Sequence, residues 1–224
     1  MAFNKEKCDA ELGRKIEEHL REIGMNTPMR EDNGITDDVK IQYIESSFTD
    51  IMNVLGLDLS DDSLVDTPRR VAKMLVKETM WGLKPENFPK CTAIDNKMNY
   101  DEIVCETGIT VMSQCEHHFV TIDGKATVAY IPNKKVLGLS KMNRIVEYFS
   151  RRPQVQERLT IQIAEALKLI LETDNVAVVL DCEHYCVKSR GVEDHTSSTV
   201  TSSLSGVFRT KPEARAEFMA LARK

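Results

Sequence analysis

Two short stretches of this chain carry the side chains best suited to chemistry. Residues 115–118 read Cys-Glu-His-His, and much later His184 and Cys186 offer the same two kinds of donor atom. Two thiolates and one imidazole from such stretches make a three-ligand zinc site, which leaves one coordination position for water. Zinc lowers the pKa of such a water toward neutrality and makes it a hydrolytic nucleophile. Mixed sulfur and nitrogen donors favour zinc over iron or copper.

A structural zinc site is the alternative, because it closes with four protein ligands. The fourth ligand beside Cys115, His118 and Cys186 would then be His117, His184 or Cys182. Two spare histidines near the ligands favour the catalytic case. If the chain is extended there, His184 shares a face with Cys186, which makes its imidazole a candidate proton donor or acceptor.

Basic residues open two of the expected helices. Arg70 and Lys73 fall in the first turn of one, and Lys141 and Arg144 follow Ser140, the expected N-cap, in another. Cations conflict with the positive end of a helix dipole, and a bound anion would remove that conflict. Two such sites predict a polyphosphate ligand, although the chain has no Gly-rich Walker sequence.

Composition narrows the class of protein. The chain has 224 residues, 42% of them hydrophobic and 29% charged, with a formal net charge of −5. This charge argues against broad nucleic-acid binding, which needs a basic face. No apolar run is long enough to span a membrane, and the first residues lack a signal-peptide core. We therefore expect a cytoplasmic protein with six reduced cysteines.

Periodicity predicts an α+β protein with helices first and strands later. We expect an N-terminal helical region over residues 1–95 and a catalytic domain over 96–224, with 83–100 as a linker. The expected helices cover residues 12–20, 37–55, 67–82, 141 onward, 153–172 and 213–223, and the strands 103–112, 119–131, 175–187 and 195–208. Asp123 and Gly124 could form a hairpin turn or a bulge. Glu157 reads as an ordinary helix-start carboxylate.

Four stretches and one single residue together resemble the GTP cyclohydrolase I family. They are residues 115–119, 138–141, 153–159 and 184–191, with Arg144, in the order and at the spacing of that family. The resemblance runs from about residue 58 to residue 209. It implies hydrolysis of GTP to 7,8-dihydroneopterin triphosphate and formate, the first step of tetrahydrofolate biosynthesis.

The resemblance also implies roles for individual residues. Zn²⁺ would bind Cys115, His118 and Cys186, and water activated there would attack C8 of the guanine ring. His117 and His184 would move protons at the purine N7 and the ribose ring oxygen, with His184 assigned to N7.

The substrate contacts that the resemblance implies form two groups. Glu157, with Gln156 beside it, would bind the guanine edge, so the helix-start interpretation of Glu157 gives way. The triphosphate would lie against residues that include both basic helix starts: Arg70, Lys73, Ser140, Lys141, Arg144 and Arg190.

The fold implied is the tunnelling fold, an antiparallel sheet with two helices on one face, preceded by an N-terminal helical region. The family assembles as a homodecamer of two stacked pentamers with active sites at subunit junctions. Two alternatives remain: a zinc-stabilised module without turnover, and a related tunnelling-fold enzyme. Of the latter, a nitrile reductase uses a nucleophilic cysteine with NADPH and a pterin synthase uses three histidine ligands, and the cysteine and histidine pattern suits neither.

Overall fold

The computed structural model describes residues 3–30 and 34–223. Contacts divide the chain into two compact units, one formed by residues 28–81 and the other by the residues on either side of that segment. The chain contains several helices as well as a five-stranded, mainly antiparallel sheet, so the predicted α+β class is confirmed. The division at residue 95 stays a prediction.

The larger unit is built on a sheet with the strand order β5-β2-β3-β6-β7. Its strands are β2 (Val104–Cys115), β3 (Thr121–Tyr130), β5 (Pro153–Gln154), β6 (Val176–His184) and β7 (Thr199–Leu204). Neighbours pair antiparallel except β2 and the short β5, which run parallel. A second, two-stranded sheet joins β1 (Ala93–Asp95) and β4 (Lys135–Leu137).

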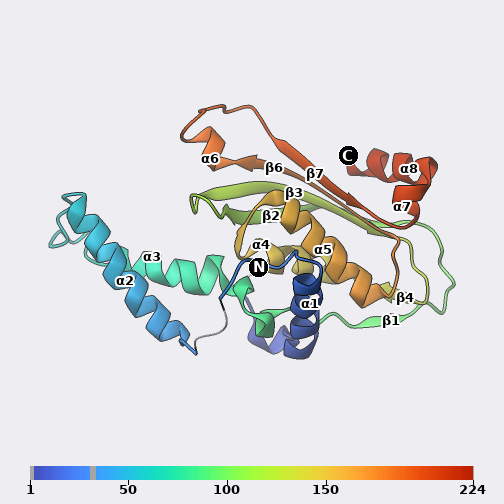
Figure 1. The fold of residues 1–224 in the computed structure, drawn as a ribbon, viewed down its shortest axis with the longest axis horizontal. Helices are drawn as coiled ribbons and strands as arrows, with labels where there is room; N and C mark the ends of the chain where they lie inside the picture. The colour runs from blue at the N-terminus through green and yellow to red at the C-terminus, as the bar shows by residue number, and fades with distance from the viewer. Residues whose placement is uncertain (1–2, 31–33, 224) are drawn as a thin grey trace. The chain divides into compact units, whose positions relative to one another are not determined.

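Two helices, α4 (Leu139–Ser150) and α5 (Gln156–Leu171), cover one face of the large sheet (Figure 1). Helix α5 buries an apolar stripe against the sheet, with Leu159, Ile163 and Leu167 fully inaccessible. Burial of such side chains stabilises the fold by about 1.5–3 kcal/mol each. The first turn of α5 therefore has a fixed position against the ends of the strands.

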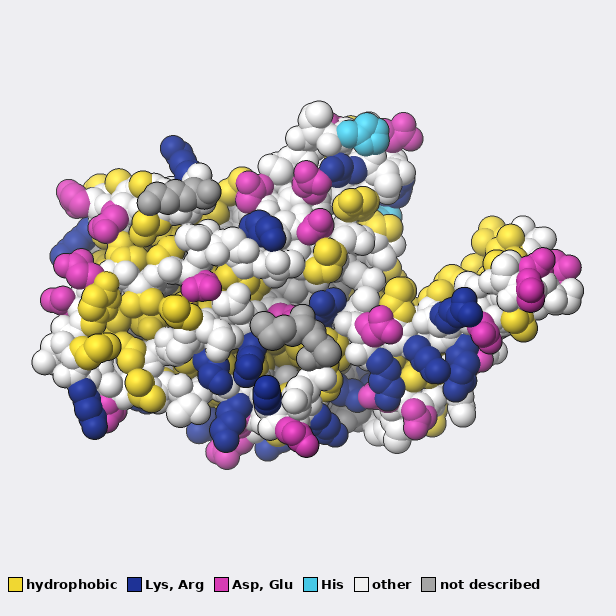
Figure 2. Space-filling model, turned by 180° about the vertical axis from the view of Figure 1, so that it is seen from behind, with side chains coloured by type: hydrophobic (Ala, Val, Ile, Leu, Met, Phe, Trp, Pro, Cys, Tyr) yellow, Lys and Arg dark blue, Asp and Glu magenta, His cyan; other side chains and the backbone are white. Residues whose placement is uncertain are grey.

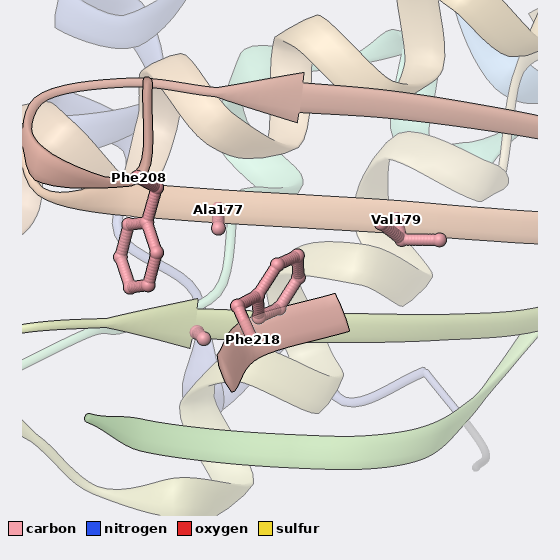
Figure 3. Close-up of a cluster of buried hydrophobic side chains, with 5 residues drawn as sticks. Ala177, Val179, Phe208 and Phe218 are labelled. Atoms are coloured by element: carbon pink, nitrogen blue, oxygen red, sulfur yellow. The ribbon is translucent and has the colours of Figure 1, made fainter. Parts of the chain in front are cut away.

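The opposite face is covered at one end by α7 (Val207–Thr210) and α8 (Pro212–Ala222). Phe208 and Phe218 pack edge to face there, with ring centroids 5.6 Å apart, against Ala177 and Val179 of β6 (Figure 3). Residue 208 was predicted to end a strand, but β7 stops at Leu204 and Phe208 belongs to the following helical turn. The aromatic pair closes the core at this end of the sheet.

The N-cap of helix α1 (Ala10–Glu22) is Asp9, whose carboxylate accepts a hydrogen bond from the Leu12 amide at 3.0 Å. The segment after residue 82 was predicted to be a linker, and this is wrong. It forms 3-10 turns at Trp81–Leu83 and Pro85–Asn87, and Phe88 is fully buried against Tyr148. Apolar burial holds this segment in the core although its prolines and polar residues suggest a loop.

Two further expectations about strands are corrected. Asp123 and Gly124 form neither a turn nor a bulge, because β3 runs through them. A Cβ atom on Gly124 would lie 2.2 Å from the Asp181 carbonyl oxygen, so glycine is needed for close approach of β6. The strand predicted over residues 175–187 ends at His184, and Cys186 lies in a helical turn, α6 (Tyr185–Lys188).

The smaller unit consists of α2 (Asp37–Val54), α3 (Thr67–Lys73) and a π-helical continuation over Met74–Thr79. Helix α3 was predicted to begin after Thr67 and to run to Gly82. Its N-cap is instead Asp66, and the π-helix ends at Thr79. These elements pack on one another, with Arg69 paired to Glu45 at 2.9 Å.

Some large apolar side chains of the larger unit stay exposed. They include Ile94, Met98 and Tyr100, which lie in β1 or between β1 and β2. Figure 2 shows exposed apolar side chains gathered at the left of the face it draws. In the described part of the chain, no helix has both the length and the apolar character needed to cross a bilayer.

Candidate metal centre and active site

A tight turn carries the first two candidate ligands. Strand β2 ends at Cys115, whose amide donates to the Val120 carbonyl at 2.8 Å, and the Phe119 amide returns to the Cys115 carbonyl at 2.9 Å. Phe119 has φ +52°, a left-handed conformation that costs a non-glycine residue roughly 1–2 kcal/mol. This turn brings His118 back over Cys115, and backbone strain of this kind is common at functional sites.

Strand pairing brings the third candidate ligand to the same place. His184, the last residue of β6, lies opposite Ile122 of β3, directly after the turn. The chain then enters α6, whose first turn contains Cys186. A cysteine far away in the sequence thus arrives beside Cys115 because β6 is antiparallel to β3.

Cys115, His118 and Cys186 form a group that could hold a metal ion. Their donor atoms all lie within 4.8 Å of one another, and Cys115 Sγ lies 3.9 Å from His118 Nδ1. Tetrahedral zinc bonds of about 2.0–2.3 Å would separate such donors by roughly 3.5–3.8 Å. His117 Nδ1 is 3.7 Å from Cys115 Sγ, but His117 is not part of the group. Cys182, an alternative ligand, is buried in the core.

The electrostatics of this group favour a cation. Burial raises the pKa of the Cys186 thiol, and the neighbouring Cys115 sulfur raises it further. Two adjacent thiolates repel each other, and a bound metal cation offsets this repulsion. The guanidinium of Arg190 donates to His118 Nε2, so this predicted triphosphate ligand lies at the edge of the group.

Contacts from α5 and β5 that were not predicted from the sequence fix the position of this turn. Arg158 of α5 pairs with Glu116, the residue after Cys115. The Glu116 amide donates to the Gln154 carbonyl at 3.0 Å, and Arg158 Nε donates to the Gln154 side chain at 3.3 Å. An acid inside the turn is visible in the sequence, but nothing there indicates its partner 42 residues away.

The other two predicted catalytic residues are close in sequence to candidate ligands, since His117 precedes His118 directly and His184 lies two residues before Cys186. His184 is half-buried, and its Nε2 lies 2.7 Å from Gln156 Oε1. Burial lowers the pKa of His184, and the nearby Glu157 carboxylate partly opposes this shift. The His117 side chain is 64% exposed and lies 4.0 Å from Glu116, so it faces solvent in this chain.

The predicted anion-binding residues fall into two sets. Ser140 and Lys141 lie in the first turn of α4 and Arg144 lies in the second, and the first turn contains no acidic residue. The N-cap is Gly138 and not Ser140, as had been expected. Arg70 and Lys73 lie on α3 in the smaller unit, in its last turn and not in the first turn as predicted, because α3 ends at Lys73. Arg70 is 3.4 Å from Asp66 and so has a local partner.

Comparison with known proteins shows the family of this chain. Residues 44–223 match the model of the family described as GTP cyclohydrolase I. The chain belongs to the GTP cyclohydrolase I family. The match spans the turn, both helix starts and Cys186, and it confirms the resemblance drawn from the motifs.

Curated relatives cover nearly the whole chain. A protein named GTP cyclohydrolase 1 from Shewanella sp. strain ANA-3 is 56% identical over 94% of this chain and 97% of its own length. One of the same name from Vibrio campbellii is 54% identical over 94% of this chain and 96% of its own. The chain is therefore an enzyme of the GTP cyclohydrolase I family.

Proposed function

We propose that this enzyme hydrolyses GTP to 7,8-dihydroneopterin triphosphate and formate, the first step of tetrahydrofolate biosynthesis. One water is consumed overall, and purine C8 leaves as formate. The observation that carries the proposal is the group of Cys115, His118 and Cys186, which lies beside two histidines. Family membership makes GTP the expected substrate.

Zinc is the metal that the donor set fits best. Two sulfurs and one imidazole nitrogen suit zinc, and three protein ligands leave a position open. When bound, zinc would supply a Lewis acid that brings the pKa of water near neutrality. Cys115 and Cys186 would bind as thiolates, and their negative charge would be offset by the cation.

The two histidines near the candidate ligands, His117 and His184, would move protons. We assign His184 to the purine N7 and His117 to the ribose ring oxygen during ring opening. His184 is held inside the protein while His117 is exposed, which suits contact with different parts of one substrate. Positioned proton transfer of this kind is worth about 10²–10⁴-fold in rate.

Charged residues around the group would bind the rest of GTP. Glu157, exposed in the first turn of α5, would accept hydrogen bonds from the guanine edge. The triphosphate would lie on the basic start of α4 and on Arg190, where helix amides and cations both favour phosphate. Arg70 and Lys73, which belong to the smaller unit, are proposed as triphosphate ligands on the family resemblance alone.

We further propose the tunnelling fold and a homodecamer of two stacked pentamers. In the described chain β7 pairs only with β6, so one edge of the sheet is open to pairing. The exposed apolar side chains near β1 also suit a subunit interface. Native mass spectrometry tests the number of subunits.

Incubation of the zinc-loaded protein with GTP tests the function. Formate and a pterin that fluoresces after oxidation should appear in equal amounts, and a chelator should abolish both. The variant His118→Ala, which loses one proposed ligand, serves as control and should give neither product. Zinc binding without formate release would support a non-catalytic zinc protein instead.

A further inference from the structure

Both polar atoms of the Gln156 side chain, Nε2 and Oε1, form hydrogen bonds within the protein. It is 1% exposed, and its Nε2 lies 2.8 Å from the Thr199 carbonyl oxygen, 3.1 Å from Thr201 Oγ1 and 3.3 Å from the Leu180 carbonyl oxygen. Its Oε1 lies 2.7 Å from Nε2 of His184. A buried amide held this way keeps one orientation, because each alternative leaves polar groups unpaired.

The two ends of this amide can be told apart chemically. Carbonyl oxygens only accept hydrogen bonds, so the atom that faces Thr199 and Leu180 must be the nitrogen. An oxygen there would face two other oxygens at hydrogen-bond distance, and their mutual repulsion disfavours it. The atom that faces His184 is therefore the oxygen, which also only accepts. The proton of that hydrogen bond must come from His184.

Two threonines fix the direction of the network further. Thr160 Oγ1 lies 2.7 Å from the backbone carbonyl oxygen of Gln156, so the Thr160 hydroxyl donates there. Thr160 Oγ1 also lies 2.7 Å from Thr201 Oγ1, and the Thr201 hydroxyl must then donate to Thr160. Thr201 Oγ1 keeps a lone pair for Gln156 Nε2, and all of these bonds are mutually consistent.

We propose that Gln156 is a positioning residue that holds neutral His184 in the tautomer with the proton on Nε2, leaving the Nδ1 lone pair free. The catalytic meaning of this assignment rests on the proposed function, but the tautomer itself does not. It differs from the role expected from the family resemblance, because both Nε2 hydrogens of Gln156 are already bonded within the protein.

This arrangement suits a group that gains and loses one proton. The Nε2–H bond to Gln156 is the same in the neutral ring and in the charged ring, so only Nδ1 changes. Gln156 therefore need not move during proton transfer. A neutral amide also orients the ring without adding the charge that a carboxylate would bring.

Nitrogen-15 spectra of zinc-loaded protein with labelled histidine test the tautomer directly. The chain has five histidines, and His184→Asn identifies the signals of His184 by their loss. At a pH where the ring is neutral, we expect a protonated Nε2 and an unprotonated Nδ1. A protonated Nδ1, or an unprotonated Nε2, overturns the inference whether or not the protein turns over GTP.

Gln156→Met tests the role, because it keeps the side-chain length and removes the hydrogen bonds. The matched control is Gln162→Met, which removes a buried glutamine of the same helix that bonds to Gln154 and the Met25 carbonyl. Gln156→Met should mix the His184 tautomers and lower kcat by about 10-fold or more, with zinc content and the KM for GTP unchanged. The control should leave the His184 spectrum and kcat near wild type.

Two results would contradict the positioning role. One is an unchanged His184 spectrum in Gln156→Met, and the other is a raised KM at normal kcat, as expected for a residue that binds guanine. Absence of product from the wild-type protein would instead overturn the proposed function and leave the tautomer result standing.

Discussion

Glu116, which directly follows Cys115, forms an ion pair with Arg158 in the first turn of α5. Their side chains are only 26% and 12% exposed, so solvent screens the pair less than a surface pair. The pair fixes the middle of the turn that carries Cys115 and His118.

Arg158→Gln should weaken metal binding without unfolding the protein. Residues that orient metal ligands typically contribute 10–100-fold in affinity, and we expect a loss of about that size. The measurement is competition between the apoprotein and a chromophoric chelator for Co²⁺ or Zn²⁺. The double variant with Glu116→Gln and Arg158→Gln should lose less metal-binding free energy than the sum of the losses in the two single variants, because the two residues act as one pair.

Lys168→Gln is the control for this prediction. Lys168 lies on the same helix and pairs with Glu165 at 2.6 Å, with similar exposure. It should leave metal affinity unchanged. Equal affinity for metal in wild type and Arg158→Gln would show that the pair does not position the turn.

Local sequence patterns predicted the helices that bury a single apolar stripe and the strands in which apolar and polar residues alternate. The stripe of α5 and the strands around residues 104–130 have a clear period, and burial then follows from it. The position of Cys186 did not follow in this way. Its stretch alternates like a strand, but the chain leaves the sheet at His184 and turns into α6.

The candidate ligands could be predicted because their chemistry is rare, but their supports could not. Cysteine and histidine at close spacing indicate metal binding wherever the chain places them. Arg158 and Gln156 act through partners on other elements, and only the pairing of β3 with β6 and the packing of α5 bring them together. The same limit applies to Phe88, whose burial depends on Tyr148 far along the chain.

Substitution of the histidines should separate metal binding from proton transfer. His118→Ala should lose both metal and turnover, because two sulfurs alone hold zinc weakly. His184→Ala should keep the metal and lose about 10²–10⁴-fold in kcat, the usual value of a general acid or base. Metal analysis and formate release are measured on the same samples, and complete metal loss in His184→Ala would contradict its assigned role.

Lys141→Ala and Arg144→Ala should mainly weaken GTP binding. Hydrogen bonds between charged groups contribute about 1.5–3 kcal/mol each, so each change should raise the KM for GTP by about 10–100-fold. Lys125→Ala is the control, since Lys125 is an exposed residue of β3 bonded to Thr110 at 3.2 Å. Unchanged GTP affinity in both variants would remove the start of α4 from the triphosphate site.

Gly124→Ala should destabilise the sheet beside the active site. The added Cβ would lie 2.2 Å from the Asp181 carbonyl oxygen and 2.6 Å from Cys182 Cα, so β3 and β6 would have to separate. Overpacking of this kind costs about 1–3 kcal/mol, and His184 lies two residues beyond Cys182. Thermal unfolding should show a lower Tm than for Lys125→Ala on the same strand, and equal Tm values would show that the strands adjust freely.

The acid stability of the larger unit should depend on Glu165. Burial alone would raise the pKa of this carboxyl, but hydrogen bonds from Lys168 and His19 outweigh it and lower the pKa below the ordinary value of 4.5. The carboxylate therefore stabilises the folded state above about pH 4.5, and this contribution is lost as the pH falls through the lower folded pKa. In Glu165→Gln, urea midpoints should be lower near neutral pH and should fall less steeply below pH 5 than in wild type. Glu18→Gln, an exposed residue of α1 that also removes one negative charge, should keep the wild-type slope, and an equally steep loss in Glu165→Gln would show that another group controls acid unfolding.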